Sequence, residues 1–341
     1  MVLFFTSPIG LGHATRDIAI AEKLKAEDIT FVTGEGAASL IARKGHNTLD
    51  MYKPRKFVVE SGELRHSFKW LMSYYSYYKK CKVIAKEILE KNDDNSLIVS
   101  DEDFASIAIG EEIGRRRVLI TDVTETHFTT GPASMIEKKM NKSMQKMMQA
   151  CDCVIIPDLG DDDDSGNVRH VGPIVRQASA DRDTLRKRFG FAKNTLVASI
   201  GGTDAGKYLI EKIIEAHRKL QSRLDLELVI VSGPSVRLPD SPAYRNLGFV
   251  DNLHELVYAA DLVISLAGRS TIDESIAYGT PGIFIPIKGH FEQEDGAARL
   301  GYQYKDIFRL ESLIEEKLGR RSNAAGAGGA ETAAKIISKL D

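Results

Sequence analysis

Short, nearly uninterrupted apolar runs alternate along the chain with longer stretches in which apolar residues recur at helical spacing. After the first run, Ala14, Ile18 and Ala21 share one face of a helix. Apolar runs bounded by turn residues are typical of strands buried in a parallel sheet. Their alternation with helices predicts an α/β fold. The runs lie at residues 2–6, 29–32, 96–100, 117–121, 154–157, 196–200, 226–232, 246–250, 262–266 and 283–287.

The stretch from residue 262 to residue 294 combines strand, turn, helix, strand and polar loop. Ala267-Gly268 closes the first strand, and Ser270 or Thr271 can N-cap the helix that follows. Glu274 lies within the first turns of this helix, which Gly279-Thr280-Pro281 ends. Such a unit places a helix N-terminus and polar side chains at the carboxyl ends of parallel strands, where open α/β sheets bind ligands.

Two glycine-containing turns also follow strands. Residues 10–16 read GLGHATR, but a dinucleotide fingerprint needs a third glycine where the chain has Thr15. Residues 201–207 read GGTDAGK and nearly match a phosphate-binding P-loop, but Tyr208 stands where magnesium coordination needs Ser or Thr. What remains in the second turn is a glycine-rich segment at a helix N-terminus, which suits a diphosphate.

Acidic residues end two predicted strands of the N-terminal half. Asp101 follows the run at 96–100, and Asp122 follows the run at 117–121. Either carboxylate can serve as a general base, although acidic residues at strand ends are also common helix caps. His13 is a third candidate base because the pKa of an imidazole lies near neutral pH.

Three other features carry weaker signals. Residues 64–89 predict a long helix with Trp70 and several tyrosines beside lysines, which suits either packing on the sheet or an acceptor or membrane interface; we favour packing. The four aspartates at 161–164 are interpreted as a solvated loop. Cys151 and Cys153, with Cys81, form neither a disulfide framework nor a zinc spacing, and we expect them to be buried.

Composition narrows the class of protein. The chain has 341 residues, enough for two domains that each bury a core. The formal net charge of −2 gives no basic field for nucleic acid. The start of the sequence reads as a first strand without a basic leader, and no apolar run approaches the roughly 18 residues of a spanning helix. We therefore expect a cytoplasmic protein, with peripheral contact at the inner face of a membrane left open.

The 262–294 stretch resembles the donor-binding motif of the GT-B glycosyltransferases, and within them family 28, which includes the enzyme that completes lipid II. The residues that carry the resemblance are Gly268, Thr271, Glu274, Gly279-Thr280-Pro281, His290 and Gln293. It implies that Glu274 accepts hydrogen bonds from the ribose hydroxyls, and that His290, Glu292, Gln293 and Glu294 lie at the donor sugar. The family often has a second Gln where this chain has Glu294.

The remaining turns fit the same resemblance. Gly10, Gly12, His13 and Arg16 look like the first loop of GT-B enzymes and of the related UDP-sugar hydrolase of pseudaminic acid biosynthesis. In those proteins the glycines let the backbone approach the donor phosphates or the acceptor, and the His is a candidate base. The resemblance assigns the diphosphate to the turns at Gly201, Gly202, Thr203 and at Gly268, Arg269, Ser270, Thr271, and a uracil pocket to Phe249 and Val250.

The resemblance implies two Rossmann-like α/β domains that face each other across a cleft. Residues 171–176 look like the linker, which predicts an acceptor-side domain at 1–172 and a donor-binding domain at 173–341. The Ala- and Gly-rich segment at 323–334 predicts a last helix that crosses back toward the first domain.

The function implied is that of an inverting, metal-independent glycosyltransferase. It would move a hexose from a UDP-sugar such as UDP-N-acetylglucosamine to the hydroxyl of a lipid-linked or glycan acceptor, with no cofactor besides that substrate. His13, Asp101 and Asp122 remain alternatives for the base. Two other hypotheses are a UDP-sugar hydrolase in which His13 activates water, and a nucleotide-sugar binding protein without turnover.

Overall fold

A computed structural model describes residues 1–25, 28–54, 58–65, 68–93, 95–127, 129, 134–160, 166–202 and 204–341, with the side chains of 68–72 left out. The chain forms two compact units. Unit 1 comprises Met1–Lys56, His66–Ile174 and Gly328–Asp341, and unit 2 comprises Phe57–Arg65 and Val175–Ala327. The aspartates at 161–164, Thr203 and the side chain of Trp70 lie outside what is described.

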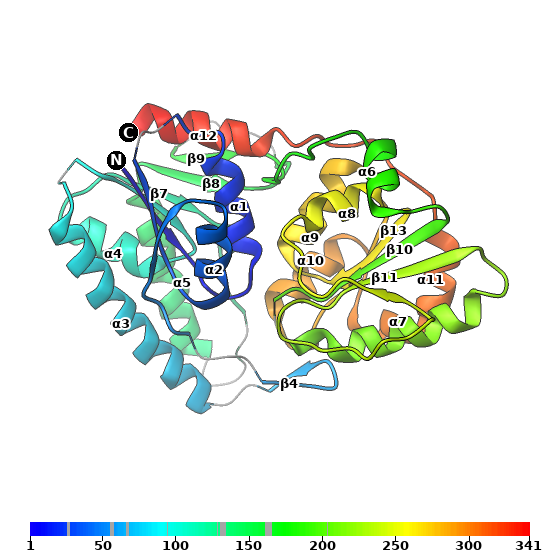
Figure 1. Ribbon diagram of the computed structural model, residues 1–341. Helices are drawn as coiled ribbons and strands as arrows, with labels where there is room; N and C mark the ends of the chain where they lie inside the picture. Colours follow the sequence, from blue (N-terminus) through cyan, green and yellow to red (C-terminus); the bar gives the residue numbers. More distant parts are fainter. Residues whose placement is uncertain are drawn as a thin grey trace. The chain divides into compact units, whose positions relative to one another are not determined.

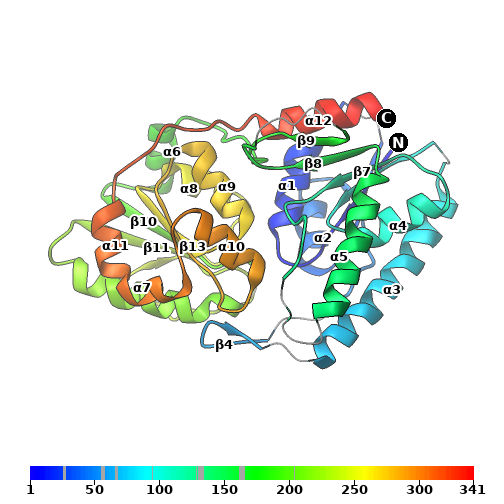
Figure 2. The ribbon, with the colours of Figure 1, turned by 180° about the vertical axis from the view of Figure 1, so that it is seen from behind.

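Unit 1 is built on a parallel sheet with the strand order β3-β2-β1-β6-β7-β8-β9. Figures 1 and 2 show α3, α4 and α5 covering one face of the sheet, with α1 and α2 on the other. The elements are β1 (Val2–Thr6), α1 (Gly12–Ala21), β2 (Ile29–Thr33), α2 (Glu35–Arg43), β3 (Asn47–Asp50), α3 (Phe68–Lys91), β6 (Leu97–Asp101), α4 (Phe104–Glu112), β7 (Arg117–Ile120), α5 (Ser134–Gln149), β8 (Cys153–Ile156), β9 (Val168–His170) and α12 (Gly329–Leu340).

Alternate residues of the unit 1 strands enter two different cores. Leu3 and Phe5 of β1 pack with α3 and α4, whereas Phe4 stacks on Phe31 of β2 with ring centroids 5.0 Å apart. Successive side chains of a strand point to opposite faces, so these apolar runs are buried on both sides. The carboxyl ends of β1 and β6 therefore lie side by side with their backbone fixed.

Unit 2 contains a second parallel sheet, in the order β12-β11-β10-β13-β14, and the hairpin β4–β5. Leu196 and Ala198 enter the core that contains α7 and α11, and Val197 enters the core that contains α6 and α8. The elements are β4 (Val59–Glu60), β5 (Glu63–Leu64), α6 (Arg182–Phe189), β10 (Asn194–Ser199), α7 (Lys207–Leu220), β11 (Leu226–Val231), β12 (Arg245–Asn246), α8 (Leu253–Ala259), β13 (Leu262–Leu266), α9 (Arg269–Tyr278), β14 (Gly282–Ile285), α10 (Phe291–Arg299) and α11 (Leu310–Lys317).

The hairpin β4–β5 comes from the N-terminal half of the chain but belongs to unit 2. The backbone of Leu64 donates to the carbonyl of Lys288 at 2.8 Å, and the backbone of Lys288 donates to Gly62 at 2.9 Å. The Tyr304 hydroxyl donates to the Ser61 carbonyl at 2.9 Å. The long helix was expected from residue 64, but α3 begins at Phe68 because Glu63 and Leu64 pair in the hairpin.

Three other features can be compared with the sequence analysis. The first sheet extends beyond the strand expected at residues 154–157, because β9, which was not expected, pairs with β8. In α3, Tyr77 and Tyr78 pack against the core, while Tyr74 and Tyr75 are 40% and 54% exposed, which agrees with the packing interpretation. The three cysteines are buried and free. Within the described residues, no helix is both long enough and apolar enough to cross a membrane.

Candidate functional site

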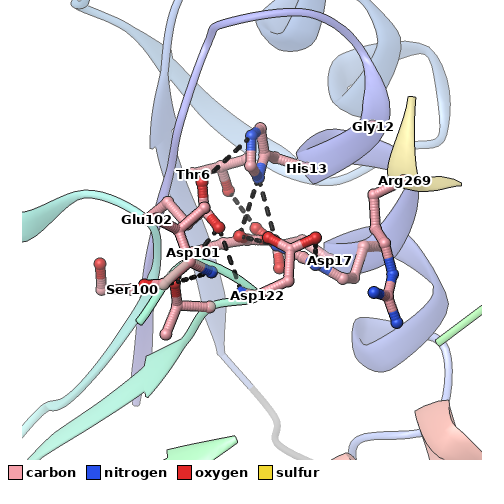
Figure 3. Close-up of polar contacts among 12 residues, drawn as sticks. Thr6, Gly12, His13, Asp17, Ser100, Asp101, Glu102, Asp122 and Arg269 are labelled. Atoms are coloured by element: carbon pink, nitrogen blue, oxygen red, sulfur yellow. Dashed lines mark hydrogen bonds and ion pairs between the residues drawn. The ribbon is translucent and has the colours of Figure 1, made fainter. Parts of the chain in front are cut away.

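The turn after β1 brings His13 to the end of β6. Gly10 has φ +79°, a conformation that L side chains rarely adopt, and it allows α1 to begin two residues later at Gly12. Thr6 and Asp101 are register partners on β1 and β6, and the Ser7 amide donates to the Asp101 carbonyl at 3.0 Å. His13 in the first turn of α1 therefore lies over Asp101, as Figure 3 shows.

His13 and Asp101 form a hydrogen-bonded pair in which one ring nitrogen is committed. Nδ1 of His13 lies 2.9 Å from Oδ1 of Asp101. Arg16 donates to the same carboxylate, from Nε to Oδ2 at 2.8 Å and from Nη2 to Oδ1 at 2.5 Å. Asp101 is fully buried, and both of its oxygens are engaged. Asp101 is thus placed to orient His13, and Nε2 is the ring nitrogen left to face a substrate.

The charges around this pair shift both pKa values. Burial alone would raise the pKa of Asp101, but Arg16 and His13 outweigh it and hold that pKa at about 2. Burial alone would lower the pKa of His13, but the carboxylates of Asp101 and Glu102 raise it to about 9. At neutral pH the imidazole is therefore mostly protonated before substrate binds.

Asp122 and Glu102 extend the site along the carboxyl ends of β7 and β6. Oδ2 of Asp122 is 3.9 Å from Nη1 of Arg16. Oε2 of Glu102 is 3.8 Å from Nε2 of His13, while its Oε1 accepts from the Thr121 hydroxyl at 3.2 Å and the Asp122 amide at 3.3 Å. The helix-cap interpretation does not apply to Asp101, because Asp103 caps α4 through the amides of Ala105 and Ser106.

In unit 2, the glycine-rich turn after β10 is shaped by close backbone approach. Gly201 has φ +76°, and a Cβ on Gly233 would stand 2.3 Å from the Gly201 carbonyl oxygen. The Ser235 hydroxyl donates a hydrogen bond to the Gly202 carbonyl at 3.0 Å, which holds the turn in place. The helix α7 that follows begins without a side-chain cap. A 3-10 helix at Asp204–Gly206 separates this turn from α7, and binding of a diphosphate here stays a prediction.

The helix after β13 begins earlier than expected. Its N-cap is Gly268 and its first residue is Arg269, so the prediction that Ser270 or Thr271 caps it is wrong. The Gly268 amide donates to Leu266 at 2.7 Å, a tight turn that starts the helix at once. No side chain caps α9 in the structure, and the amides of a first helical turn have no partner within the helix. Arg269 is not an isolated charge, since its Nε is 3.0 Å from Asp273.

Glu274 lies in the second turn of α9 and is almost completely buried, at 4% exposure. Oε1 is 3.9 Å from Nη2 of Arg176, and Oε2 has no hydrogen-bond partner within the described part of the chain. Burial raises the pKa of Glu274 to about 7, although Arg176 opposes this shift. An unsatisfied buried carboxylate oxygen is costly, and ligand hydroxyl groups would satisfy it.

Known proteins match this arrangement of sequence and structure. Residues 196–321 match the glycosyltransferase family 28 C-terminal domain. An uncharacterized glycosyltransferase of Methanosarcina acetivorans is 25% identical over 323 residues, covering 87% of this chain and 82% of that protein. The glycosyltransferase of kitacinnamycin superposes with a TM-score of 0.68 at 15% identity, over 99% of this chain and 98% of that one. The chain is a glycosyltransferase with the GT-B fold, and residues 196–321 are similar to the family 28 C-terminal domain.

Other relatives of this glycosyltransferase are matched over shorter stretches. An uncharacterized glycosyltransferase of Methanopyrus kandleri is 28% identical over 214 residues, and the match covers 60% of each chain. The UDP-N-acetylglucosamine–N-acetylmuramyl-(pentapeptide) pyrophosphoryl-undecaprenol N-acetylglucosamine transferase of Mycolicibacterium smegmatis is 29% identical over 199 residues, 54% of this chain and 48% of that protein.

The glycosyltransferase holds the other predicted donor residues differently from the sequence expectation. Phe291 to Glu294 are not a loop but the first turn of α10, with His290 as N-cap. Oε1 of Gln293 accepts from the Ile287 amide and Oε1 of Glu294 from the Gly289 amide, both at 3.1 Å. The strand expected at 246–250 spans only Arg245–Asn246, and Val250 packs partly against the α6–α8 core. Contact of these residues with a donor stays a prediction.

Two residues of the glycosyltransferase site were missed by sequence reasoning. Glu102 was passed over because its neighbour Asp101 ends the apolar run, and nothing in a glutamate signals its backbone conformation. Asp17 is fully buried on α1, accepts from the Thr6 hydroxyl at 2.5 Å, and has a pKa raised well above its usual value by burial and by Asp101. An acidic residue on the otherwise apolar face that begins with Ala14 and Ile18 was the available signal.

Proposed function

We propose that this glycosyltransferase moves a sugar from a UDP-sugar to an acceptor hydroxyl, with His13 as the general base. The observation that carries the proposal is the His13–Asp101 hydrogen bond at 2.9 Å, with Asp101 buried and held by Arg16. In this arrangement Nδ1–H donates to Asp101, so the deprotonated ring presents the lone pair of Nε2. This nitrogen can take the proton of a hydroxyl group within hydrogen-bond reach.

The reaction is an in-line displacement that inverts the anomeric carbon. The acceptor oxygen forms a bond to that carbon as the bond to the diphosphate oxygen breaks, and the acceptor proton moves to Nε2 of His13. The resulting imidazolium is stabilised by Asp101 and Glu102, the same carboxylates that raise its pKa. The diphosphate leaves with the bonding electrons, and its added charge is stabilised by the uncapped amides of α9 and the turn at Gly201 and Gly202. The scheme routes no step through a metal.

The nucleotide and acceptor classes rest on the donor side of unit 2. Glu274 has a buried oxygen with no hydrogen-bond partner among the residues that the structure describes, which suits two neighbouring ribose hydroxyls. The relative from Mycolicibacterium smegmatis is named for UDP-N-acetylglucosamine and for an undecaprenol-linked acceptor. On this support we propose a UDP-N-acetylglucosamine-like donor and a lipid-linked or glycan acceptor for this chain.

The test begins with binding and continues to products. Thermal unfolding is measured with UDP, GDP, dTDP, ADP and their sugar conjugates, because a ligand that binds only the native state raises the melting temperature. Selective stabilisation by UDP species is the expected result, and no shift with any nucleotide contradicts the proposal. The stabilising sugar nucleotide is then incubated with candidate acceptors. A glycoside product supports transfer, whereas free sugar at the same rate with and without acceptor identifies a hydrolase.

His13→Ala is the matching variant for the base. It should lower kcat by about 10²–10⁴-fold, the usual contribution of a positioned general base. Donor affinity should change little, because the proposed donor contacts lie in unit 2. Equal losses of turnover and donor affinity would contradict the assignment.

A further inference from the structure

Asp17 is a buried carboxyl group that the proposed reaction does not use. It lies on α1, one helical turn after His13, and its side chain is 0% exposed. The Thr6 hydroxyl donates to Oδ2 at 2.5 Å, whereas Oδ1 meets no hydrogen-bond donor among the residues that the structure describes. A buried carboxylate is costly unless it is paired with a cation and hydrogen-bonded. The neighbours of Asp17 therefore decide whether it carries a charge.

A second buried carboxyl group, that of Asp101, lies beside Asp17. Thr6 and Asp101 are register partners on the adjacent parallel strands β1 and β6, so their side chains point to the same face of the sheet. Asp17 binds the side chain of Thr6 on that face, and Figure 3 draws all three in the cluster around His13. Two carboxylates that share a buried site repel each other, and one of them then retains its proton.

The contacts of Arg16 decide which of the two is charged. Its Nε and Nη2 donate to Asp101 at 2.8 and 2.5 Å, and its Nη1 lies 3.9 Å from Asp122. Arg16 holds the pKa of Asp101 at about 2, whereas burial and Asp101 raise the pKa of Asp17 well above its usual value. A water molecule at Oδ1 of Asp17 would supply a hydrogen bond, but it would leave the repulsion between two ionised carboxylates. The shared proton therefore resides on Asp17.

We propose that Asp17 is a positioning residue, a neutral carboxylic acid whose O–H group donates a hydrogen bond to Asp101. A carboxylate oxygen can accept two hydrogen bonds, and within the described chain Oδ2 of Asp101 accepts only from Nε of Arg16. Three side chains of α1 at helical spacing, His13, Arg16 and Asp17, would then hold one carboxylate. This inference rests on the proposed function in what it implies for His13 as the base.

The neutral form of Asp17 keeps His13 from binding its proton too tightly. The carboxylates of Asp101 and Glu102 already raise the pKa of His13 to about 9. An ionised Asp17 would add a further negative charge and raise that pKa again. A hydrogen bond donated to Asp101 has the opposite effect, because it draws negative charge away from the carboxylate that faces the imidazole. Asp17 thus increases the fraction of His13 that is deprotonated at a given pH.

The first experiment detects the proton by infrared spectroscopy of the full-length protein, at about pH 8.5 so that Glu274, with a pKa of about 7, is ionised. The wild type should show the carbonyl stretch of a protonated carboxylic acid, and this band should be missing from Asp17→Asn. Thr6→Val should move the band to higher frequency without removing it, because the acid carbonyl loses its hydrogen bond. Asp306→Asn is the matched control, since Asp306 is a carboxyl group of unit 2 that is 1% exposed and accepts from Arg309 at 2.7 Å. It should leave the band unchanged.

The second experiment measures the pKa of His13 by NMR. The chain has eight histidines, and the ring signal of His13 is assigned by its loss in His13→Ala. In Asp17→Asn the amide can donate to Asp101 and accept from Thr6, so the pKa of His13 should stay within about 0.3 pH unit of the wild type. Asp17→Leu has no donor, so the pKa of His13 should rise by about 0.5–1 pH unit. Asp17→Val serves the same purpose if Asp17→Leu does not fold.

The outcomes separate this inference from the proposed function. An infrared difference between the wild type and Asp17→Asn without an acid band would overturn it. A pKa of His13 that falls by about one pH unit or more in Asp17→Asn would show that Asp17 is ionised in the wild type. An unchanged pKa of His13 in the apolar variants would make Asp17 a structural residue only. Neither experiment requires a sugar nucleotide or turnover, so both decide the role of Asp17 even if no sugar is transferred.

Discussion

The His13–Asp101 pair stabilises the fold most at a pH where His13 is protonated and cannot act as a base. The pKa of Asp101 falls from 3.8 to about 2, so its contribution to stability is present above 3.8 and is lost as pH falls toward 2. The pKa of His13 rises from 6.5 to about 9, so its contribution is complete below 6.5 and is lost as pH rises through 9. The base form of His13 grows only as the second contribution is lost.

The first prediction concerns the pH dependence of transfer. In the wild type, kcat/KM should rise with pH up to about 9, because only the deprotonated imidazole accepts the acceptor proton. In Asp101→Asn the largest attraction for the proton is gone, so this rise should move to lower pH while its plateau falls. The measurement is the pH profile of kcat/KM for both proteins. An acid limb at the same pH in both would show that Asp101 does not set the titration.

The second prediction concerns Glu274. Its pKa is raised from 4.5 to about 7, so the folded protein binds this proton more tightly and loses stability as pH rises from 4.5 through 7. Glu274→Gln cannot ionise, so its stability relative to the wild type should grow between about pH 5 and pH 8, by up to roughly 3 kcal/mol.

Nucleotide binding provides the second half of that test. The same variant should bind UDP more weakly, because hydrogen bonds to a charged group contribute roughly 1.5–3 kcal/mol. Denaturant unfolding at the two pH values gives the stability, and calorimetry gives the affinity for UDP. Unchanged UDP affinity would remove Glu274 from the nucleotide site, whatever the stability shows.

At the scale of single elements, the apolar strands could be predicted from the sequence and the polar ones could not. The strand at Leu262–Leu266 has the predicted bounds because its run is apolar on both faces. The edge strand Val168–His170 and the hairpin at 59–64 contain too few apolar residues to show a period. The start of α10 could not be predicted either, because the polar residues Glu292, Gln293 and Glu294 suit a loop and the first turn of a helix equally.

For the candidate site, the sequence could place residues at strand ends and turns, but it could not predict which of them contact each other. Strand ends and glycine turns located His13, Asp101, Asp122 and Glu274 on the right edges of their sheets. His13 and Asp101 lie 88 positions apart in the sequence, and their pairing depends on the register of β1 with β6. Glu102 lies beside Nε2 of His13 with a φ of +56°, and α9 starts at Arg269 after a two-residue turn; neither feature leaves a periodic signal in the sequence.

The third prediction tests the glycine-rich turn as an element. Gly233→Ala should displace the turn, because its Cβ would stand 2.3 Å from the Gly201 oxygen at a φ of +70°. Gly319→Ala is the control, with a φ of +72° and nothing within 4 Å of its Cβ. Both should lose roughly 1 kcal/mol of stability to backbone strain. Gly233→Ala alone should lose more, and should also lose affinity for UDP by calorimetry. Equal changes of stability and of UDP affinity in the two variants would show that the turn accommodates the added Cβ without being displaced.

At the scale of the whole molecule, the C-terminal helix completes the first unit. Five residues of α12 are buried: Gly329 and the four that carry side chains, Ala330, Ala333, Ala334 and Ile337. A Cβ on Gly329 would stand 2.3 Å from the Pro173 carbonyl, and Arg116 donates to the Leu340 carbonyl. Residues near the end of the sequence thus contribute to the same unit that holds His13.

The fourth prediction follows from that arrangement. In a chain that ends at Ala327, the free energy of unfolding of unit 1 should fall by several kcal/mol. The four buried side chains of α12 are missing, and the apolar surface that they cover becomes exposed to water. Hydrogen exchange measured by mass spectrometry should show faster exchange in β1, β2 and α1, with α9 and β13 unchanged. Hydrogen exchange that becomes faster in both units alike, or in neither, would contradict the assignment of α12 to unit 1.

The chain passes from one unit to the other four times, near residues 56, 65, 174 and 327. A chimaera that combines the acceptor specificity of one parent with the donor specificity of another could be joined at a single point between the two units. For this glycosyltransferase a single junction at residue 174 would take α12 from the wrong parent and leave the β4–β5 hairpin beside a foreign Lys288. An exchange that respects the structure must carry residues 57–65 together with 175–327, and keep 328–341 with the first unit.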